Sequence, residues 1–379
     1  MNMKMINYLL MTIRKKCVIC GGELDHLFTL NMPPFMGVSS EVKLIDLNKM
    51  IFTKCVDCDT VQLEELLPPE IVYQGNHNIG IVGKTWEEHY NELVDFIKPH
   101  ITDKRILEIS DPSAKIAKRL SDESDKWYIV EPNPDIESFG NVTFINEFFD
   151  SNFNMDDKID IIVNSHFFEH TYDPNQFLVD CFNLLDDGGS MIISIPNLEF
   201  LLNDKVSPNG ILHFEHTFYY DLSRLETIFK NNGFYIERIQ EYKKHSLFIQ
   251  LIKDSKSSNY KELSDDVSNK FINNLNYHKK QINKINDTII DKDNVYLYGS
   301  HVTSQFYIFN GLNTINIKGV LDNSKSKQGK FLFGTDLKVL DPNTIDISEE
   351  IIILCSHMGI YFEEIKNQLN NLSDNIVII

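Results

Sequence analysis

Four of the six cysteines lie in two CxxC motifs near the N-terminus, Cys17–Cys20 and Cys55–Cys58. Cysteines three positions apart can bring both sulfurs to one metal ion, and four thiolates complete the tetrahedral shell of Zn²⁺ at Zn–S distances of about 2.3 Å. The 34 residues at positions 21–54 separate the pairs and leave room for one or two hairpins. We predict a structural zinc site with the ligands Cys17, Cys20, Cys55 and Cys58. Two redox-active dithiols or four unrelated thiols are the alternatives.

Length and charge restrict the class of protein. A chain of 379 residues exceeds one ordinary hydrophobic core and predicts two or three domains. Its 36 basic and 55 acidic residues give a net charge of −19, which repels nucleic-acid phosphates. No apolar segment reaches the roughly 20 residues of a membrane span, and no secretory signal is recognisable. We expect a cytoplasmic protein that binds neither nucleic acid nor a membrane.

The middle of the chain alternates short buried runs with helical stretches. We expect a zinc module over residues 1–70, which Pro68 and Pro69 end, and a doubly wound α/β sheet over 71–252. The predicted parallel strands are Arg105–Ile109, Trp127–Glu131, Val142–Ile145, Ile159–Val163 and Gly189–Ile195. Two further strands, Phe234–Gln240 and Ser246–Ile252, are close enough in sequence to form a hairpin at the sheet edge.

The sequence pattern in the last third of the chain predicts a helix followed by a second α/β unit. Residues 253–292 contain apolar side chains every three or four positions from Val267 to Ile285, which indicates one long amphipathic connecting helix. Residues 293–379 then read as a smaller Rossmann-like domain, since the strand Val295–Tyr298 ends in a glycine and is followed by a helix. This unit lacks GxGxxG, so no dinucleotide is inferred.

Ligands of doubly wound sheets bind beyond the carboxyl ends of the strands, near the point where the strand order reverses. Glu131 ends the second predicted strand, where an acid commonly accepts both hydroxyls of an adenosyl ribose. A helix-capping acid is the alternative for this residue. The other strand ends carry Ser110 and Asp111, Asn146 and His166. We therefore expect a polar ligand at this edge.

Several motifs in this order resemble a class I S-adenosylmethionine-dependent methyltransferase: LEI, VEPNP, DIIVNSHFFEH followed by DP, and a GG-initiated strand that ends in IPN. Further motifs point to one group within this class: the two CxxC motifs and the C-terminal sequences YG, VLDN, KQG and GT. The whole chain is similar to three-domain C-methyltransferases that act on nucleotide-linked deoxysugars. This implies S-adenosylmethionine and structural Zn²⁺ as cofactors and a nucleotide sugar as substrate. We expect a monomer or a homodimer.

The resemblance also implies roles for particular residues. In that family a Tyr-His-Glu-His motif after the fifth strand supplies acid/base groups, and the matching stretch here is His213-Phe214-Glu215-His216. The predicted catalytic residues are His216, Glu215, His170 and His213, although any single histidine can equally be a structural hydrogen bonder. The predicted cofactor-binding residues are Glu108, Ser110, Asp111, Glu131, Pro132, Asn146 and His166.

Three departures from the family pattern lie in the predicted site. Residues 110–114 contain no glycine, although glycines in this loop permit a positive φ and a close approach to the ligand. The tyrosines expected after the zinc module are not in place, and His77 is the candidate substitute. His213 replaces the motif tyrosine. The competing hypotheses are a catalytically silent, zinc-stabilised binding or scaffold protein and an oxidoreductase built on the C-terminal unit. Whether carbon or oxygen is methylated stays open.

Overall fold

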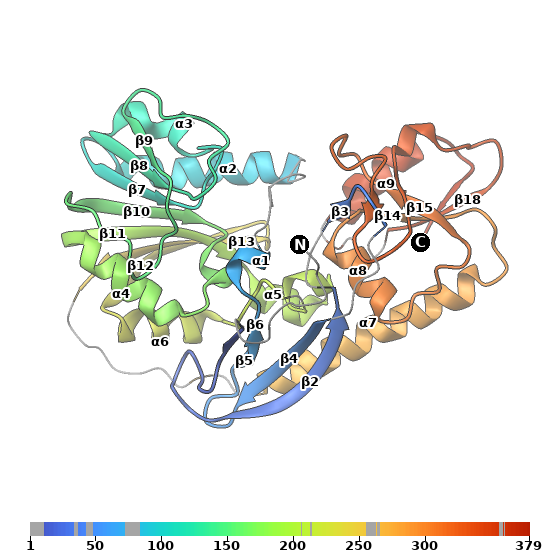
Figure 1. The fold of residues 1–379 in the computed structure, drawn as a ribbon, viewed down its shortest axis with the longest axis horizontal. Helices are drawn as coiled ribbons and strands as arrows, with labels where there is room; N and C mark the ends of the chain where they lie inside the picture. Colours follow the sequence, from blue (N-terminus) through green and yellow to red (C-terminus); the bar gives the residue numbers. More distant parts are fainter. Residues whose placement is uncertain are drawn as a thin grey trace.

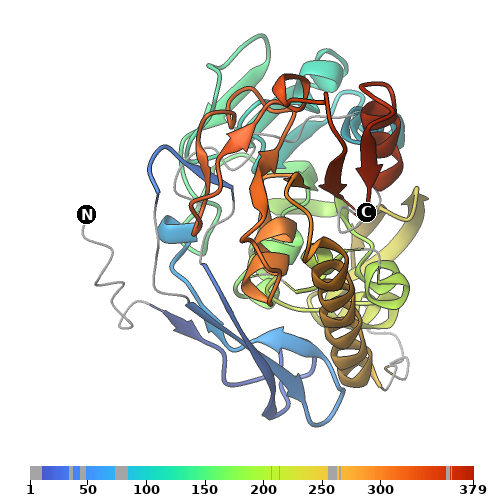
Figure 2. The same cartoon turned by 90° about the vertical axis from the view of Figure 1, so that its right-hand side faces the viewer.

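The computed structural model describes residues 11–33, 37–42, 48–72, 84–205, 207–212, 214–254, 263, 266–355, 359 and 361–379. The architecture is α/β, as predicted (Figure 1). An N-terminal module of small sheets lies between a seven-stranded sheet and a five-stranded sheet, and one long helix runs beneath the last (Figures 1 and 2). Among the described residues, no helix has both the length and the apolar character needed to cross a membrane.

The larger sheet has the strand order β9-β8-β7-β10-β11-β13-β12. Its strands are β7 (Arg105–Ile109), β8 (Lys126–Val130), β9 (Val142–Ile145), β10 (Ile159–Ser165), β11 (Leu185–Pro196), β12 (Phe234–Tyr242) and β13 (Ser246–Lys253). The first five are parallel, and β13 and β12 form the predicted antiparallel hairpin at one edge. The order reverses between β7 and β10, which is where a ligand is expected.

Helices cover both faces of this sheet because its central strands are apolar on both sides. The covering helices are α2 (Lys84–Ile97), α3 (Ala117–Leu120), α4 (Pro174–Leu184), α5 (Leu198–Asp204) and α6 (Leu222–Asn231). Short 3₁₀ helices are η3 (Lys98–His100), η4 (Ser121–Glu123), η5 (Phe168–His170) and η6 (Pro208–Gly210). The expected alternation is not strict, because residues 131–141 between β8 and β9 form turns and bends rather than a helix.

The N-terminal module contains a three-stranded antiparallel sheet of β2 (Leu24–Met32), β4 (Asn48–Cys55) and β5 (Val61–Leu63). Two shorter strands, β1 (Thr12–Ile13) and β6 (Glu65–Leu66), pair beside it, and helix α1 (Pro69–Val72) follows. Strand β3 (Val38–Ser39) pairs with β16 (Phe331–Leu332) of the C-terminal region. The module is therefore joined to both larger sheets, since its core residues also belong to the same apolar cluster as theirs.

The C-terminal sheet is parallel and has the order β17-β15-β14-β18-β19. Its elements are β14 (Val295–Tyr298), α8 (Val302–Phe309), β15 (Ile317–Leu321), β17 (Val339–Leu340), η7 (Pro342–Thr344), β18 (Ile351–Leu354), α9 (Phe362–Asn370) and β19 (Ile376–Ile378). The connecting helix α7 (Val267–Ile289) confirms the predicted apolar stripe, which is buried along its length. Helix α7 runs beside the module and the C-terminal sheet (Figure 1), and its buried apolar residues belong to the same cluster as theirs.

Candidate functional site

The four N-terminal cysteines converge on one point. The Sγ–Sγ distances are 3.6 Å between Cys17 and Cys58, 3.4 Å between Cys20 and Cys55 and 3.4 Å between Cys20 and Cys58. Four sulfurs around Zn²⁺ at about 2.3 Å would lie about 3.8 Å apart, close to this arrangement. The amides of Ile19 and Asp57 each lie 3.4 Å from a cysteine sulfur, Cys17 and Cys55 in turn. The set therefore fits a tetrahedral metal site with amide donors around its thiolates.

The turn after the first CxxC depends on its glycines. Gly21 has a φ of +75°, in the left-handed region, and its amide donates to the carbonyl of Cys17 at 2.9 Å. A Cβ at Gly22 would lie 2.2 Å from Oδ2 of Asp57 and 2.9 Å from Sγ of Cys55. Side chains at these two positions would therefore strain the turn or push the two CxxC motifs apart.

Glu131 lies where the sequence predicts an acid for a ribose. It follows β8, and its amide donates to the carbonyl of Ile145 at 3.1 Å. Its Oε1 accepts the amide of Asn133 at 3.0 Å, and the hydroxyl of Ser110 lies beside the carboxyl. Burial raises the pKa of Glu131, and the charges of Asp111 and Asp135 add to this effect. A carboxylate in such surroundings gains from further hydroxyl donors.

The glycine-free loop after β7 has the backbone that glycines usually supply. Ser110 and Ala114 have φ angles of +64° and +52°, in the left-handed region. The amide of Ser110 donates to the carbonyl of Val130 at 3.0 Å, and the carboxylate of Asp111 accepts the amides of Ser113 at 3.1 Å and Lys115 at 2.5 Å. These bonds hold a conformation that costs roughly 1–2 kcal/mol per L-residue. Two positions of this loop therefore take a left-handed φ without glycine.

The remaining predicted cofactor residues differ in exposure. Glu108 is buried in β7, where its Oε2 accepts the indole N–H of Trp127 at 2.8 Å. Burial raises the pKa of Glu108 well above its usual value, and the nearby charge of Asp111 raises it further. Pro132 is half-buried and Asn146 is exposed at the ends of β8 and β9. The structure thus groups Glu108, Ser110, Asp111, Glu131 and Pro132, with Asn146 farther along the same edge.

Asn164 carries polar atoms that the described residues do not satisfy. It lies near the end of β10, beside Ile109 of β7, and is 0 % exposed. Within the described part of the chain, neither its Oδ1 nor its Nδ2 has a hydrogen-bond partner. Such groups are rare and costly in folded proteins. At the point where strand order reverses, this amide indicates that a ligand or ordered water supplies the missing partners.

His166, the last predicted cofactor residue, lies in a buried group of histidines. Its φ is +52°, its Nε2 lies 2.9 Å from Oγ of Ser246, and Nδ1 of His245 lies 2.6 Å from the same hydroxyl. The rings of His89, His166 and His245 surround that of Trp86 at centroid distances of 4.9–5.2 Å. Burial lowers the pKa of His166 to about 3, so its imidazole is neutral at physiological pH.

Predicted catalytic residues meet at the start of the segment after β10. Nδ1 of His170 lies 3.7 Å from Oε2 of Glu215, and Nε2 of His170 lies 3.7 Å from Oε1 of Glu169. The rings of His170 and His216 are 5.3 Å apart. The amide of Thr217 donates to the carbonyl of Glu169 at 3.0 Å and ties the two segments together. The structure therefore brings Glu215, His216 and His170 into one cluster, together with Glu169.

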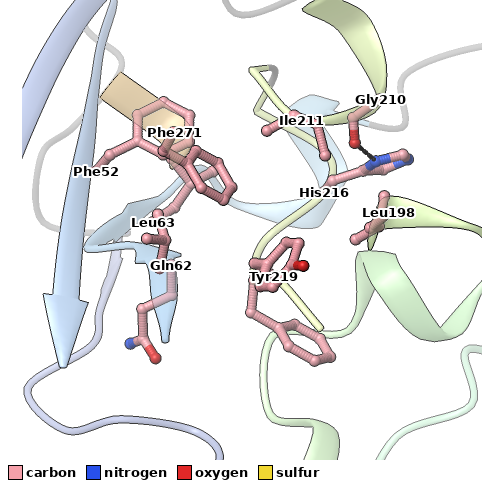
Figure 3. Close-up of a pocket in the computed structure, with 11 residues that line it drawn as sticks. Phe52, Gln62, Leu63, Leu198, Gly210, Ile211, His216, Tyr219 and Phe271 are labelled. Atoms are coloured by element: carbon pink, nitrogen blue, oxygen red, sulfur yellow. Dashed lines mark hydrogen bonds between the residues drawn. The ribbon is translucent and has the colours of Figure 1, made fainter. Parts of the chain in front are cut away.

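The protonation of this cluster follows from its burial. Burial raises the pKa of Glu169 to about 7 and, with the charge of Glu169, that of Glu215 to about 8. Burial lowers the pKa of His216, while Glu169 opposes this shift. Nδ1 of His216 lies 2.8 Å from the carbonyl of Gly210 (Figure 3). A carbonyl can only accept, so Nδ1 carries the proton and Nε2 keeps the lone pair of a base.

A small cavity of about 10 Å³ lies beside His216, with room for roughly one water molecule. Three parts of the chain surround it (Figure 3). Its lining residues are Phe52, Val61, Gln62 and Leu63 from the N-terminal module, Leu198, Gly210, Ile211, His216, Phe218 and Tyr219 from the segments after β11, and Phe271 from α7. The module and α7 therefore contribute to the surroundings of the predicted base.

Two candidates from the sequence, His213 and His77, lie outside the described residues. Glu169 was missed as a functional candidate, although its place before His170 was a usable signal. Asn164 lies within the motif DIIVNSHFFEH but was not chosen, because the sequence does not show that its amide is buried without partners.

The comparisons with known proteins address the sheet that carries this cluster. Residues 84–239 match a family model described as a methyltransferase domain. This segment is therefore similar to a methyltransferase domain. The match spans β7 to β12 and includes the predicted cofactor edge and the acid/base cluster. A comparison with curated proteins finds no match.

Solved methyltransferases are similar to about half of this chain at low identity. The N-methyltransferase NodS from Bradyrhizobium japonicum is 9% identical, with 45% of this chain and 97% of that chain covered and a TM-score of 0.35. The magnesium protoporphyrin IX methyltransferase ChlM from Synechocystis PCC 6803 is 13% identical, with coverage of 48% and 90% and a TM-score of 0.36. A Mesorhizobium loti S-adenosylmethionine-dependent methyltransferase is 11% identical, with coverage of 45% and 98% and a TM-score of 0.35. At these values the likeness adds nothing about the substrate.

Proposed function

We propose that the chain transfers a methyl group from S-adenosylmethionine to a nucleotide-linked deoxysugar and that His216 and Glu215 remove the acceptor proton. The methyltransferase domain supports the donor. The observation that carries the proton-handling role is the Nδ1–H of His216 held by the carbonyl of Gly210, which places the lone pair of the neutral imidazole on Nε2. The sugar-nucleotide acceptor rests on the order of motifs along the chain, from the CxxC pairs to the C-terminal unit.

The donor edge of the domain fits the cofactor. Glu131 would accept the ribose hydroxyls, and the loop from Ser110 to Ala114 would approach the methionine end with its left-handed backbone. The unsatisfied amide of Asn164 lies at the same edge. When bound, S-adenosylmethionine supplies an electrophilic methyl group on a sulfonium. The residues of this chain would orient donor and acceptor and exclude water from them.

The acceptor side needs a base, because a hydroxyl or a carbon acid must lose a proton as the new bond to methyl forms. Nε2 of His216 would take this proton and become an imidazolium, which the charge of Glu169 stabilises. Glu215 would share a proton with His170, since their side chains lie 3.7 Å apart. The C-terminal unit would contact the nucleotide part of the substrate.

His216→Gln tests the proton-handling role. This variant removes the base but keeps a side chain that can donate to Gly210, so kcat for methyl transfer from labelled S-adenosylmethionine to a panel of nucleotide sugars should fall by about 10²–10⁴-fold. Binding of S-adenosylhomocysteine should be unchanged. The exposed His26→Gln is the matched control. Full turnover by the His216 variant would contradict the role.

We also propose that the four cysteines bind structural Zn²⁺. The sulfur geometry supports this, and four thiolates leave no open position for chemistry. Purified protein should contain one zinc ion per chain, and Co²⁺ in its place should show thiolate-to-metal charge-transfer absorption. Cys55→Ser should weaken both signals, whereas Cys181→Ser, in the core of the methyltransferase domain, should leave them intact. A metal-free protein of full stability would exclude the site.

A further inference from the structure

Arg14 belongs to the N-terminal module, yet its guanidinium lies against the methyltransferase domain. It is 7% exposed. Its Nη2 donates to the carbonyls of Thr171 at 3.1 Å and Tyr172 at 2.7 Å and to the hydroxyl of Thr217 at 2.9 Å. Its Nη1 and Nε donate to the carbonyls of Thr217 and Tyr172. One side chain therefore binds two segments that are more than 40 positions apart in sequence.

These two segments carry the proposed acid/base residues. Thr171 directly follows Glu169 and His170, and Thr217 directly follows Glu215 and His216. The hydroxyl of Thr217 donates to the carbonyl of Thr171 at 2.7 Å, so the segments already touch where Arg14 binds them. The guanidinium thus holds the two segments together at Thr171 and Thr217, the residues that directly follow the two Glu–His pairs.

The charge of Arg14 is met mainly by backbone carbonyls. Across the described ranges, no carboxylate lies within salt-bridge distance of this guanidinium. Two of its acceptors follow the 3₁₀ helix η5, whose C-terminal carbonyls favour a cation. Burial lowers the pKa of Arg14 to about 10, and the charge of Asp173, beyond salt-bridge distance, opposes this only in part. Burying an arginine with so little acidic compensation is expensive, so a merely adhesive contact is a poor explanation for it.

Backbone hydrogen bonds of the N-terminal module hold both Arg14 itself and the segment that follows His216. The amide of Arg14 donates to the carbonyl of Glu64 at 2.9 Å, and Cys17 follows three positions later. Strand β5 extends toward the segment after His216, since the amide of Leu63 donates to the carbonyl of Thr217 at 3.0 Å. The amide of Tyr219 donates to the carbonyl of Val61 at 2.8 Å. The segment is therefore held by the edge of the module sheet.

Arg224 crosses the same interface in the opposite direction. It is fully buried in α6, and its guanidinium donates to the carbonyl of Cys58 at 2.6 Å and to the hydroxyl of Thr60 at 2.9 Å. It also pairs with Asp221. Its guanidinium also lies over the ring of Tyr219, at 5.8 Å from the centroid, two residues beyond the Thr217 that Arg14 binds. Arg224 is therefore a matched control for buried arginines between the module and the methyltransferase domain.

We propose that Arg14 is a positioning residue for methyl transfer: it fixes the separation of the Glu169–His170 and Glu215–His216 segments, so that the four-cysteine module completes the reacting site. The geometric part stands on the hydrogen bonds of Arg14 alone, while the kinetic part rests on the proposed function. Loss of Arg14 should therefore change proton handling without changing the cofactor edge around Glu131.

Arg14→Lys tests the proposal because lysine keeps the charge but cannot bridge both segments with a planar fork. The first readout is NMR of protein labelled with ¹⁵N-histidine, in which the side-chain signals of His170 and His216 should shift and the N–H bond to Gly210 should weaken. The second readout is kinetic: kcat should fall about 10–100-fold, with the KM for S-adenosylmethionine and the metal content unchanged. Arg224→Lys should move neither the histidine signals nor kcat.

The outcomes separate this proposal from the function it refines. Folded, metal-loaded Arg14→Lys protein with unchanged histidine signals and unchanged kcat would overturn it. If no acceptor supports turnover, the NMR readout decides by itself: shifted His170 and His216 signals support the positioning role, and unshifted signals overturn it. If Arg14→Lys does not fold, Thr217→Val removes the hydroxyl that Arg14 binds, and the same two outcomes apply.

Discussion

The two doubly wound sheets of this chain place an acid at the same topological position. Glu131 follows β8, the neighbour of the central strand β7, and Asp322 follows β15, the neighbour of the central strand β14. Both acids are largely buried, at 8% and 9% exposure. By position alone, either could accept the hydroxyls of a ribose.

Their surroundings differ. Asp322 accepts the amide and the hydroxyl of Ser300 at 2.9 and 2.6 Å and the amide of Ser324 at 2.9 Å, with Nζ of Lys327 at 3.5 Å. Burial raises its pKa, but Lys327 and these donors outweigh burial, so the net pKa is lowered. The net pKa of Glu131 is raised, chiefly by burial. Asp322 accepts three hydrogen bonds and faces a lysine, whereas Glu131 accepts from Asn133 and Ser110 and faces the acids Asp111 and Asp135. The partners of an acid, rather than its place in the fold, therefore distinguish the two positions.

The largest expected effect separates the two acids by cofactor affinity. Glu131→Ala should weaken S-adenosylhomocysteine binding about 100-fold, because two charge-assisted hydrogen bonds of about 1.5 kcal/mol each are lost. Asp322→Ala should leave the affinity unchanged. Calorimetric titration of both variants measures this difference. Equal losses would show that the C-terminal sheet also binds the cofactor.

For the free energy of unfolding, we expect the larger effect at Asp322 and the smaller one at Glu131. Asp322→Asn should lower the free energy of unfolding by about 2–3 kcal/mol, because Lys327 loses its buried partner. Glu131→Gln should cost little. The pKa of Asp322 is lowered in the folded protein, so its contribution is present above its ordinary pKa of 3.8 and is lost as the pH falls through the folded value. Urea titrations at neutral and acidic pH test both statements; a cost that persists in acid would contradict them.

Glu215→Gln extends the comparison to a third buried acid, one whose pKa is raised by burial and by a neighbouring acid. Burial, with the charge of Glu169, raises the pKa of Glu215 to about 8 from 4.5. The folded state keeps a proton that the unfolded state releases, so the free energy of unfolding should fall as the pH rises from about 4.5 to about 8. The variant should escape this loss and gain on the order of 1–3 kcal/mol over the wild type across that range. Both proteins contain the same buried histidines, so the contribution of these to the pH dependence cancels in the difference. Parallel pH profiles of the free energy of unfolding for wild type and variant would contradict the prediction.

The smallest expected effect concerns the backbone beside Glu131. Ser110 has a left-handed φ of +64°, so Ser110→Gly should raise the free energy of unfolding by about 1 kcal/mol and keep cofactor affinity within a few-fold. Ser113, in the same loop but outside the left-handed region, is the control, and Ser113→Gly should destabilise the protein. Thermal unfolding measures both. Destabilisation by Ser110→Gly would mean that its hydroxyl bond to Glu131 outweighs the strain.

The parts of the fold that local chemistry determines were predictable. Four thiols in two CxxC pairs meet in space, and apolar runs such as Ile161–Val163 form central strands. The expected alternation of strand and helix fails between β8 and β9, where residues 131–141 contain two prolines and form turns. It also fails between β9 and β10, where residues 146–158 form no helix. Residues 110–114 contain no glycine, yet Ser110 and Ala114 take a positive φ that hydrogen bonds of the loop hold in place. Residue type alone does not reveal such hydrogen bonds.

The site was predictable only where a motif carried it. Glu215, His216 and His170 follow from the family pattern, and the structure brings them together, but their roles stay predictions. Arg14 could not be chosen, since an arginine before a CxxC motif is ordinary and its partners are carbonyls more than 150 positions away. Asn164 was equally invisible, because an unsatisfied amide can be recognised only once its surroundings are known.

The most direct test of the central claim is calorimetric titration of the purified, metal-loaded protein with S-adenosylhomocysteine. We expect one site per chain with micromolar affinity, abolished or strongly weakened by Glu131→Ala and unaffected by Asp322→Ala. A folded protein that binds neither S-adenosylhomocysteine nor S-adenosylmethionine would contradict this expectation, and would favour a silent binding protein on a methyltransferase fold.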